Sequence, residues 1–372
     1  MFHLNTLEQG GAERVVSNLA NEFSKGDDEI IVATQWFGED EFKLNEKVRR
    51  IHVGLKDSDE NKSRITKAVL RLKYLRDTIK AEKPDVVIAF AQKAIYRAGF
   101  AMMGLDNKLI VCVRTDPKGH YDQLIDKISL PLINKRADGA VFQTVGQRDF
   151  FSKHWQDIST IILNPVNDKY FIDDTDIPKT KTIVQHARLV DFKNQPMLID
   201  AFMQVHAKYP EYDLKIYGPD SFDGTKKILE KKIKEYKAED FITLCGGSDE
   251  LEKLVPKASI YAFSSDWEGL PNTLIEALTM GMCVVATDCP CGGPRTIMPN
   301  TIEKLGTIEK TDRGILVPIM NADAMAQGII YMIENPEYAN SCKKAAMDIR
   351  TDVLGSSIVS KWKEYILKVI DK

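Results

Sequence analysis

Short apolar, β-branched segments alternate along the chain with longer segments whose apolar residues recur every three to four positions. In the first half the apolar segments are IIVAT, DVVIAF, LIVCV and GAVFQT, and a helical period covers residues 65–82. Apolar strands that alternate with amphipathic helices are typical of a parallel sheet covered by helices. We therefore expect an α/β domain in this part of the chain.

The same alternation restarts after residues 164–182, where prolines, aspartates and lysines interrupt every period. We place a domain boundary there and expect two doubly wound domains, residues 1–166 and 167–372, with a cleft between them. The last helix packs either with the second domain or back on the first. In such sheets ligands bind beyond the carboxyl ends of the strands. The expected helices of the second half cover residues 195–208, 225–237, 249–256, 272–280 and 323–334.

Composition limits the possible functions of the chain. Its 372 residues are 44% hydrophobic and 28% charged, and no apolar segment approaches the roughly 18 residues that a membrane span requires. The net charge of −3 gives no case for nucleic-acid binding. Six cysteines without CxxC spacing predict reduced core thiols. The N-terminal residues lack the features of a secretory signal, so we expect a cytoplasmic protein.

The segment SSDWEGLPNTLIEAL, residues 264–278, carries the first functional signal. Pro271 suits the first turn of a helix, which places Glu276 on its second turn and Glu268 in the loop before it. The amides of residues 271–274 would then form a helix N-terminus that suits phosphate, and a carboxylate on each side could accept hydrogen bonds from sugar hydroxyls. This arrangement fits a nucleotide sugar; the alternative is a loop glutamate and a solvated helix position.

Two further segments suit the same ligand. Arg188 follows a predicted strand and Lys193 lies five residues later, so both could converge on one anion, or they are a surface arginine and a helix-start lysine. Gly10 and Gly11 form a predicted strand-to-helix turn that a phosphate or sugar could approach closely, or a turn needed only for packing. The strand before them, MFHL, leaves little room and is itself in doubt.

These segments together resemble the retaining family 4 glycosyltransferases of the GT-B superfamily, of the bacterial surface-polysaccharide type. SSDWEGLPNTLIEALTMGMCVVATDCP resembles the E-x7-E signature of that family, GGAERVV its N-terminal glycine loop, and HARLVDFKNQPMLIDAF its Arg and Lys segment. The later turns IYGPD and CGG also match. The resemblance implies a GT-B fold, two Rossmann-like domains with an N-terminal acceptor-binding and a C-terminal donor-binding domain.

The resemblance also implies roles for single residues. Arg188 and Lys193 would hold the donor diphosphate, Glu276 the ribose hydroxyls and Glu268 the hydroxyls of the transferred sugar. Other positions would contact the donor through the backbone: Asn272, Thr273, Leu274, Gly218, Cys245 and Gly246.

The chain departs from the family pattern at several positions. His186 and Ala187 stand where many relatives have glycine, and this departure could reshape the phosphate turn. Thr296 stands where an acid is common, so the resemblance does not determine the edge of the donor sugar pocket. Relatives often carry an acceptor-side His or acid after the fourth strand, and here Asp116 and His120 are the candidates. His120 is as consistent with a surface loop as with catalysis.

The resemblance implies a reaction that needs no metal and no cofactor besides the nucleotide sugar, which we expect to be UDP-hexose or UDP-N-acetylhexosamine. In a retaining transfer the leaving phosphate can accept the acceptor's proton, and electrostatic stabilisation of the leaving group dominates. The only DxD segments, residues 57–59 and 174–176, are interpreted as solvated turns.

Residues 62–83 hold eight cations against two acids, with an apolar stripe at helical spacing. Such a helix suits an anionic membrane surface, or it packs on the core with a solvated basic face. The first interpretation predicts a peripheral protein at the inner membrane face, with a lipid-linked saccharide acceptor, in capsule or other surface-polysaccharide biosynthesis. The alternatives are a non-catalytic nucleotide-sugar-binding protein and a nucleotide-sugar epimerase of GT-B fold.

Overall fold

The computed structural model describes residues 1–8, 10–172, 177 and 179–371. The chain divides into two compact units, one formed by Met1–Pro165 with Val353–Lys372 and the other by Val166–Asp352. The boundary lies one residue from the predicted one, and the last helix belongs to the first unit, which was the alternative placement. Within the described ranges, no helix is long and apolar enough to cross a membrane.

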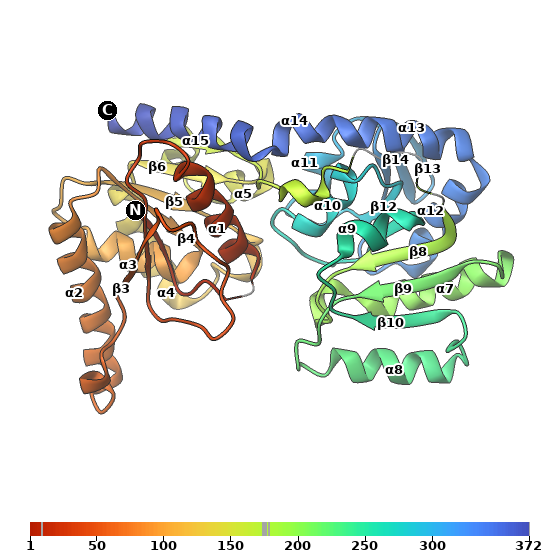
Figure 1. The fold of residues 1–372 in the computed structure, drawn as a ribbon, viewed down its shortest axis with the longest axis horizontal. Helices are drawn as coiled ribbons and strands as arrows, with labels where there is room; N and C mark the ends of the chain where they lie inside the picture. Colours follow the sequence, from red (N-terminus) through yellow and green to blue (C-terminus); the bar gives the residue numbers. More distant parts are fainter. Residues whose placement is uncertain (9, 173–176, 178, 372) are drawn as a thin grey trace. The chain divides into compact units, whose positions relative to one another are not determined.

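The first unit is built on a seven-stranded sheet with the order β3-β2-β1-β4-β5-β6-β7, in which every recorded pairing is parallel (Figure 1). The doubtful first strand is present, and although it has only three residues it lies between β2 and β4 and is fully buried. The strands are β1 (Phe2–Leu4), β2 (Ile31–Thr34), β3 (Arg49–His52), β4 (Val86–Phe90), β5 (Lys108–Cys112), β6 (Gly139–Phe142) and β7 (Ser159–Ile161).

Helices cover both faces of this sheet. Buried side chains of α2, α3 and α4 pack on one face, and those of α1 and α15 pack on the other. Trp362 of α15 stacks on Phe90, and the Tyr365 hydroxyl accepts a hydrogen bond from the Ala140 amide at 2.8 Å, which fixes the C-terminal helix to this unit. The helices are α1 (Gly11–Phe23), α2 (Arg64–Glu82), α3 (Gln92–Ala101), α4 (Leu124–Arg136), α5 (Val145–Phe150), α6 (Lys153–Asp157) and α15 (Gly355–Ile370).

The second unit has an eight-stranded sheet with the order β10-β9-β8-β11-β12-β15-β14-β13. Its pairings are parallel from β10 to β15, and β14 and β13 add an antiparallel edge. The strands are β8 (Thr180–His186), β9 (Asp213–Tyr217), β10 (Ile242–Gly246), β11 (Ala258–Phe263), β12 (Val284–Thr287), β13 (Thr301–Leu305), β14 (Ile308–Thr311) and β15 (Gly314–Val317).

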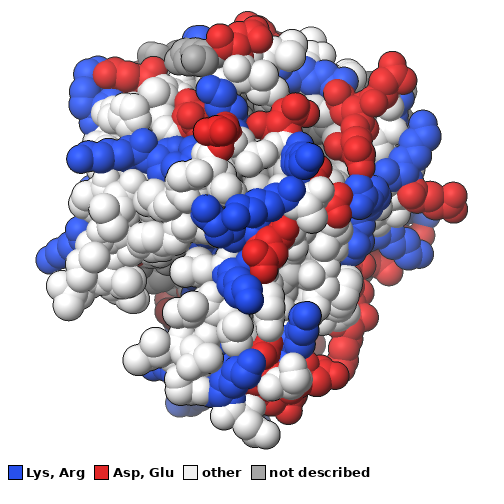
Figure 2. Space-filling view, turned by 90° about the vertical axis from the view of Figure 1, so that its left-hand side faces the viewer, with Lys and Arg blue, Asp and Glu red and all other residues white. Residues whose placement is uncertain are grey.

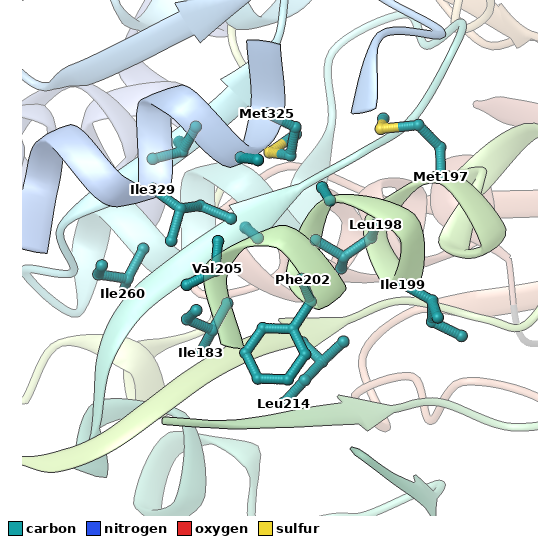
Figure 3. Packing of buried hydrophobic residues seen from close by; sticks show 14 of the residues in the cluster. Ile183, Met197, Leu198, Ile199, Phe202, Val205, Leu214, Ile260, Met325 and Ile329 are labelled. Carbon is teal, nitrogen blue, oxygen red and sulfur yellow. The ribbon is translucent and has the colours of Figure 1, made fainter. Parts of the chain in front are cut away.

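The core on one face of this sheet is formed largely by α7 and α12. Figure 3 shows Phe202 and Leu198 of α7 among isoleucine and leucine side chains of the strands, with Met325 and Ile329 of α12 nearby. Pro196 lies in the first turn of α7, where proline is tolerated because no backbone N–H is needed there. The helices of this unit are α7 (Gln195–Lys208), α8 (Thr225–Glu235), α9 (Leu251–Leu254), α10 (Asn272–Thr279), α11 (Gly293–Ile297), α12 (Ala322–Glu334), α13 (Pro336–Ala346) and α14 (Arg350–Val353).

The prediction of two Rossmann-like α/β domains is confirmed, with corrections in detail. The sequence pattern did not predict four strands that are short or partly exposed: β3, β7, β13 and β14. Because β3 was missed, the loop with Asp116 follows the fifth strand and not the fourth. The interpretation of residues 57–59 as a solvated turn is wrong for Asp59, which is fully buried and accepts hydrogen bonds from Lys62 and Tyr74. The second DxD segment, residues 174–176, lies outside the described residues. All six cysteines are free.

Candidate active site

The candidate site lies at the carboxyl ends of β8 and β11, which pair in parallel at the centre of the second sheet. The loop after β8 carries Arg188 and Lys193, and the loop after β11 carries Glu268. Glu276 follows on the second turn of α10. Adjacent parallel strands end at the same edge of a sheet, so this topology brings the predicted donor-binding residues to one place.

Lys193 and Glu268 contact each other directly. The Lys193 ammonium forms an ion pair with the Glu268 carboxylate, and the two side chains are only 11% and 16% exposed. The Ser265 hydroxyl lies 3.4 Å from the same carboxylate oxygen. The lysine also lies over the rings of Phe192 and Phe263, at 5.5 and 5.8 Å from their centroids. A mostly buried cation beside an acid can serve a ligand that carries both phosphate and hydroxyl groups.

A chain of hydrogen bonds holds the loop that carries Lys193. Gln185 donates to the Ser264 hydroxyl at 2.8 Å, and that hydroxyl donates to the Lys193 carbonyl at 2.7 Å. Asn194 has a left-handed backbone with φ 45°, a conformation that asparagine tolerates well, and its side chain accepts from the third amide of α7. The Asn194 amide donates to both carboxylate oxygens of Asp266, at 2.9 and 3.0 Å. The site lysine is therefore fixed from both strands.

Asp266 is the buried acid of this support. Burial raises the pKa of its carboxyl, while the hydrogen bonds from Asn194 act in the opposite direction. Its backbone amide also donates to the Phe192 carbonyl at 2.9 Å, which joins the two site loops directly. Trp267 stacks on Phe192 with ring centroids 6.0 Å apart. None of Gln185, Ser264 or Asp266 was predicted as a site residue, because each acts through a contact between segments distant in sequence.

Glu276 is buried and forms a hydrogen bond with a residue that the sequence showed only as a departure. Nε2 of His186, the last residue of β8, lies 2.9 Å from Oε2 of Glu276. Both residues are buried. The His186 ring also lies 5.3 Å from the ring of Tyr261, in an edge-on arrangement. The alternative of a solvated helix position is therefore wrong for Glu276.

The first turn of α10 begins the helix beside these side chains. Its first intrahelical bond runs from the Ile275 amide to the Pro271 carbonyl at 3.1 Å, so the amides of Asn272, Thr273 and Leu274 precede the helical ladder. Pro271 is the N-cap, directly before the predicted first helical residue 272, and its side chain forms no cap hydrogen bond. Amides at such a position favour an anionic group.

The segment GGPRTI packs closely against this turn. A Cβ on Gly293 would lie 2.1 Å from the carbonyl oxygen of Gly269, so only glycine fits there. The hydroxyl of Thr296, the residue that stands in place of an acid, bonds to the Gly292 carbonyl at 2.7 Å. Thr296 therefore satisfies its hydrogen bonding within its own helix.

The remaining donor candidates of the second unit lie at the ends of strands or in the loops that follow them. The Arg188 side chain is exposed, and its carbonyl accepts a hydrogen bond from Gln195 at 2.9 Å. Gly218 follows β9, and a Cβ there would lie 1.8 Å from the carbonyl oxygen of Ala187, which is a packing reason for glycine. Cys245 and Gly246 end β10, and Gly246 turns the chain with φ 71°. Their roles toward a nucleobase stay predictions.

The acceptor-side candidates belong to the first unit. Gly10 is the N-cap of α1 and Gly11 its first residue, as the strand-to-helix turn predicted. Asp116 is buried and caps a short turn by accepting from the Lys118 amide at 3.0 Å. His120 is exposed, and its Nδ1 lies 3.1 Å from the Asp116 carbonyl. These contacts hold the loop together and leave the catalytic role of either residue a prediction.

Comparisons with known proteins agree with this geometry. A model described as glycosyltransferase family 4 matches residues 9–169, and one described as glycosyl transferases group 1 matches residues 168–348. Two Rossmann-like domains with these matches define a glycosyltransferase of the GT-B class. The chain belongs to family 4 of that class, as the sequence motifs predicted.

Curated relatives cover nearly the whole chain at low identity. An uncharacterised glycosyltransferase of Haemophilus influenzae is 22% identical over 97% of this chain and 98% of its own length. A Campylobacter jejuni protein named as a GalNAc-alpha-(1->4)-GalNAc-alpha-(1->3)-diNAcBac-PP-undecaprenol alpha-1,4-N-acetyl-D-galactosaminyltransferase is 24% identical, over 99% of this chain and 98% of its own. The name of the second relative describes an N-acetylgalactosaminyltransferase that acts on a saccharide linked to undecaprenol.

Solved structures share the fold. The Anabaena HepE structure in complex with UDP superposes with a TM-score of 0.81 at 18% identity, covering 99% of both chains. The sucrose-phosphate synthase of Thermosynechococcus elongatus gives a TM-score of 0.78 at 14% identity, covering 100% of this chain and 98% of its own. At these identities the likeness establishes the GT-B fold of the chain.

Proposed function

We propose that this enzyme transfers a sugar from a UDP-sugar, a UDP-hexose or UDP-N-acetylhexosamine, to a lipid-linked saccharide acceptor, with retention of configuration and without a metal ion. The pathway would be the synthesis of a cell-surface polysaccharide such as a capsule, at the cytoplasmic face of the membrane. The observation that carries the proposal is the mostly buried Lys193–Glu268 ion pair after β8 and β11, with Glu276 and the first turn of α10 directly following the same β11 loop.

The proposed chemistry uses these groups on the donor. The bond between the anomeric carbon and the β-phosphate oxygen breaks, and the acceptor oxygen bonds to the same face of that carbon. The acceptor's proton passes to the leaving phosphate, so no protein base is required. Lys193, Arg188 and the first amides of α10 would stabilise the negative charge that develops on the diphosphate. Glu268 and Glu276 would orient the sugar and the ribose.

The donor is tested with a panel of UDP-sugars, together with GDP- and ADP-sugars, read by thermal shift and by nucleotide release. A true donor raises the unfolding temperature by mass action, and UDP compounds are expected to do so most strongly. The Glu276→Ala variant should lose most of this shift. Absence of any shift and of any nucleotide release with every compound would refute the proposed function.

The same assay separates the alternatives. Binding without nucleotide release, with or without added saccharides, would indicate a non-catalytic binding protein. An altered sugar still attached to UDP would indicate an epimerase. Release that persists in excess EDTA supports the metal-free reaction, and proton NMR of the first-formed anomer tests retention.

The membrane part of the proposal is supported by the surface of α2. Ser63 caps the helix, and its first half is exposed: Ile65 is 79% and Val69 58% exposed. The apolar stripe therefore packs on the core only in its second half, where Leu75 and Ile79 are buried. In Figure 1 the lower end of α2 extends beyond the rest of its unit. Figure 2 shows this side of the molecule, where Lys and Arg side chains lie among uncharged surface and Asp and Glu side chains.

Helix α4 adds a second exposed apolar stripe on the same face of the sheet. The side chains of Leu124, Ile125, Ile128 and Leu132 are all exposed, and they follow one another at helical spacing. Exposed apolar side chains together with cations are the combination that binds at a lipid headgroup boundary. The sequence interpretation did not identify this stripe.

Vesicle flotation tests the membrane proposal. The protein should float with vesicles that contain anionic lipid and remain behind with zwitterionic ones. Exchanging the exposed α2 cations Arg64 and Lys73 for glutamate should abolish flotation. The same exchange at Lys227 and Lys234, two exposed lysines of α8, is the matched control and should have little effect. Indifference of flotation to lipid charge would overturn the membrane proposal and leave the transfer reaction standing.

A further inference from the structure

His186 stands at the end of β8 and its side chain faces the helix that carries Glu276. Its Nε2 lies 2.9 Å from Oε2 of Glu276, and both residues are nearly inaccessible to solvent. The pairing is not local, since 90 residues separate the two positions in sequence. It exists because β8 and β11 are neighbours and α10 follows β11.

The hydrogen bonds around His186 show which ring nitrogen carries the proton of this contact. Nδ1 of His186 is buried and has no hydrogen-bond partner among the described residues. A carboxylate can only accept a hydrogen bond, so Nε2 of His186 carries the N–H and donates it to Glu276. The imidazole ring lies edge-on to the Tyr261 ring, with centroids 5.3 Å apart, and the Tyr261 hydroxyl donates to the backbone carbonyl of His186 at 3.3 Å. The imidazole therefore has little freedom to turn away.

A buried carboxylate needs hydrogen-bond donors to stay charged and to keep one orientation. Glu276 would need both properties to bind a ribose, because two vicinal hydroxyls are held by an ionised acceptor of fixed direction. Glycine or a small apolar residue at position 186 could supply neither. A histidine at this position thus has a chemical consequence beyond packing.

We propose that His186 is a positioning residue for the nucleotide: its hydrogen bond holds the Glu276 carboxylate in one orientation for the ribose hydroxyls of the donor. This inference rests on the proposed function, in which Glu276 contacts the ribose. His186 acts through Glu276 and does not touch the reacting bond. Its removal should therefore weaken donor binding and leave the chemical step largely intact.

The test compares three substitutions that differ in where a donor group remains. His186→Gln places an amide N–H near the position of Nε2, His186→Asn places it near Nδ1, and His186→Leu removes it. UDP affinity is measured by calorimetry, and KM and kcat by release of UDP from the best donor of the panel. Thermal unfolding of each variant establishes that it is folded.

His186→Leu and His186→Asn should weaken UDP binding and raise KM by about 10- to 100-fold, the loss expected for a hydrogen bond to a charged group. Their kcat at saturating donor should stay within about 3-fold of the wild type, and His186→Gln should restore binding to a similar margin. In a Glu276→Ala background, His186→Leu should have almost no further effect. If the leucine variant does not fold, the comparison of UDP binding between the Asn and Gln variants tests the inference, since both residues are polar and of similar size.

Unchanged UDP affinity in His186→Leu, or a full effect of that substitution in the absence of the Glu276 carboxylate, would overturn the inference. The inference would also be overturned if His186→Gln bound UDP no more tightly than His186→Asn. These outcomes are distinct from failure of the proposed function, which would appear as a wild-type protein that binds neither UDP nor any UDP-sugar.

Discussion

Lys193→Ala is the substitution that tests the proposed chemistry most directly. The ammonium lies in an ion pair with Glu268, and at 11% exposure it is largely protected from solvent screening. An ammonium about 4 Å from a phosphate oxygen, at an effective dielectric constant of about 20, contributes roughly 4 kcal/mol. Loss of one such stabilising group at a preorganised site typically costs about 3 to 4 kcal/mol of the transition state. The expected fall in kcat is therefore about 100- to 1,000-fold.

The assay is release of UDP from a saturating UDP-sugar, with donor affinity measured separately for each variant. Lys208→Ala is the matched control, because Lys208 also forms an ion pair with a glutamate of this unit, Glu334, but on the exposed surface. Exposed pairs contribute little, so the control should keep both its kcat and its unfolding temperature close to the wild-type values. A folded Lys193→Ala protein with wild-type turnover would refute the reasoning.

Two further predictions concern stability. Phe202→Ala should lower the free energy of unfolding by about 3 to 5 kcal/mol in urea titration, because Phe202 is fully buried, whereas Phe222→Ala, at a position 91% exposed, should change it by less than about 0.5 kcal/mol. Hydrogen bonding to Arg295 lowers the pKa of Glu309 from its ordinary 4.5 to about 2, so the ionised carboxylate stabilises the fold above about pH 4.5, and this contribution is lost as the pH falls toward 2. Glu309→Gln should thus cost about 1 to 2 kcal/mol at pH 7 and roughly half of that or less at pH 3; an equal cost at both pH values would contradict the assignment.

The fold class and the main elements could be predicted because they depend on local patterns. The period of α7 gave its bounds of 195–208, and the apolar runs of β8 and β11 gave two buried strands. Burial of parallel strands on both faces leaves an unbroken apolar run that a sequence shows plainly. Strands such as β3 and β13 could not be found, because they are short and partly exposed and are stabilised by their neighbours.

The sequence by itself determined the residue types of the site: the acids at 268 and 276, the lysine at 193 and the turn that starts α10. Only the tertiary structure decided which of them meet. In the folded protein Lys193 forms an ion pair with Glu268, and Glu276 forms a hydrogen bond with His186. One side of α4 is buried, while its apolar stripe is exposed. The physical reason is strand order: contacts between residues 75 to 90 positions apart arise because β8 and β11 are hydrogen-bonded neighbours, and no local period encodes which strands become neighbours.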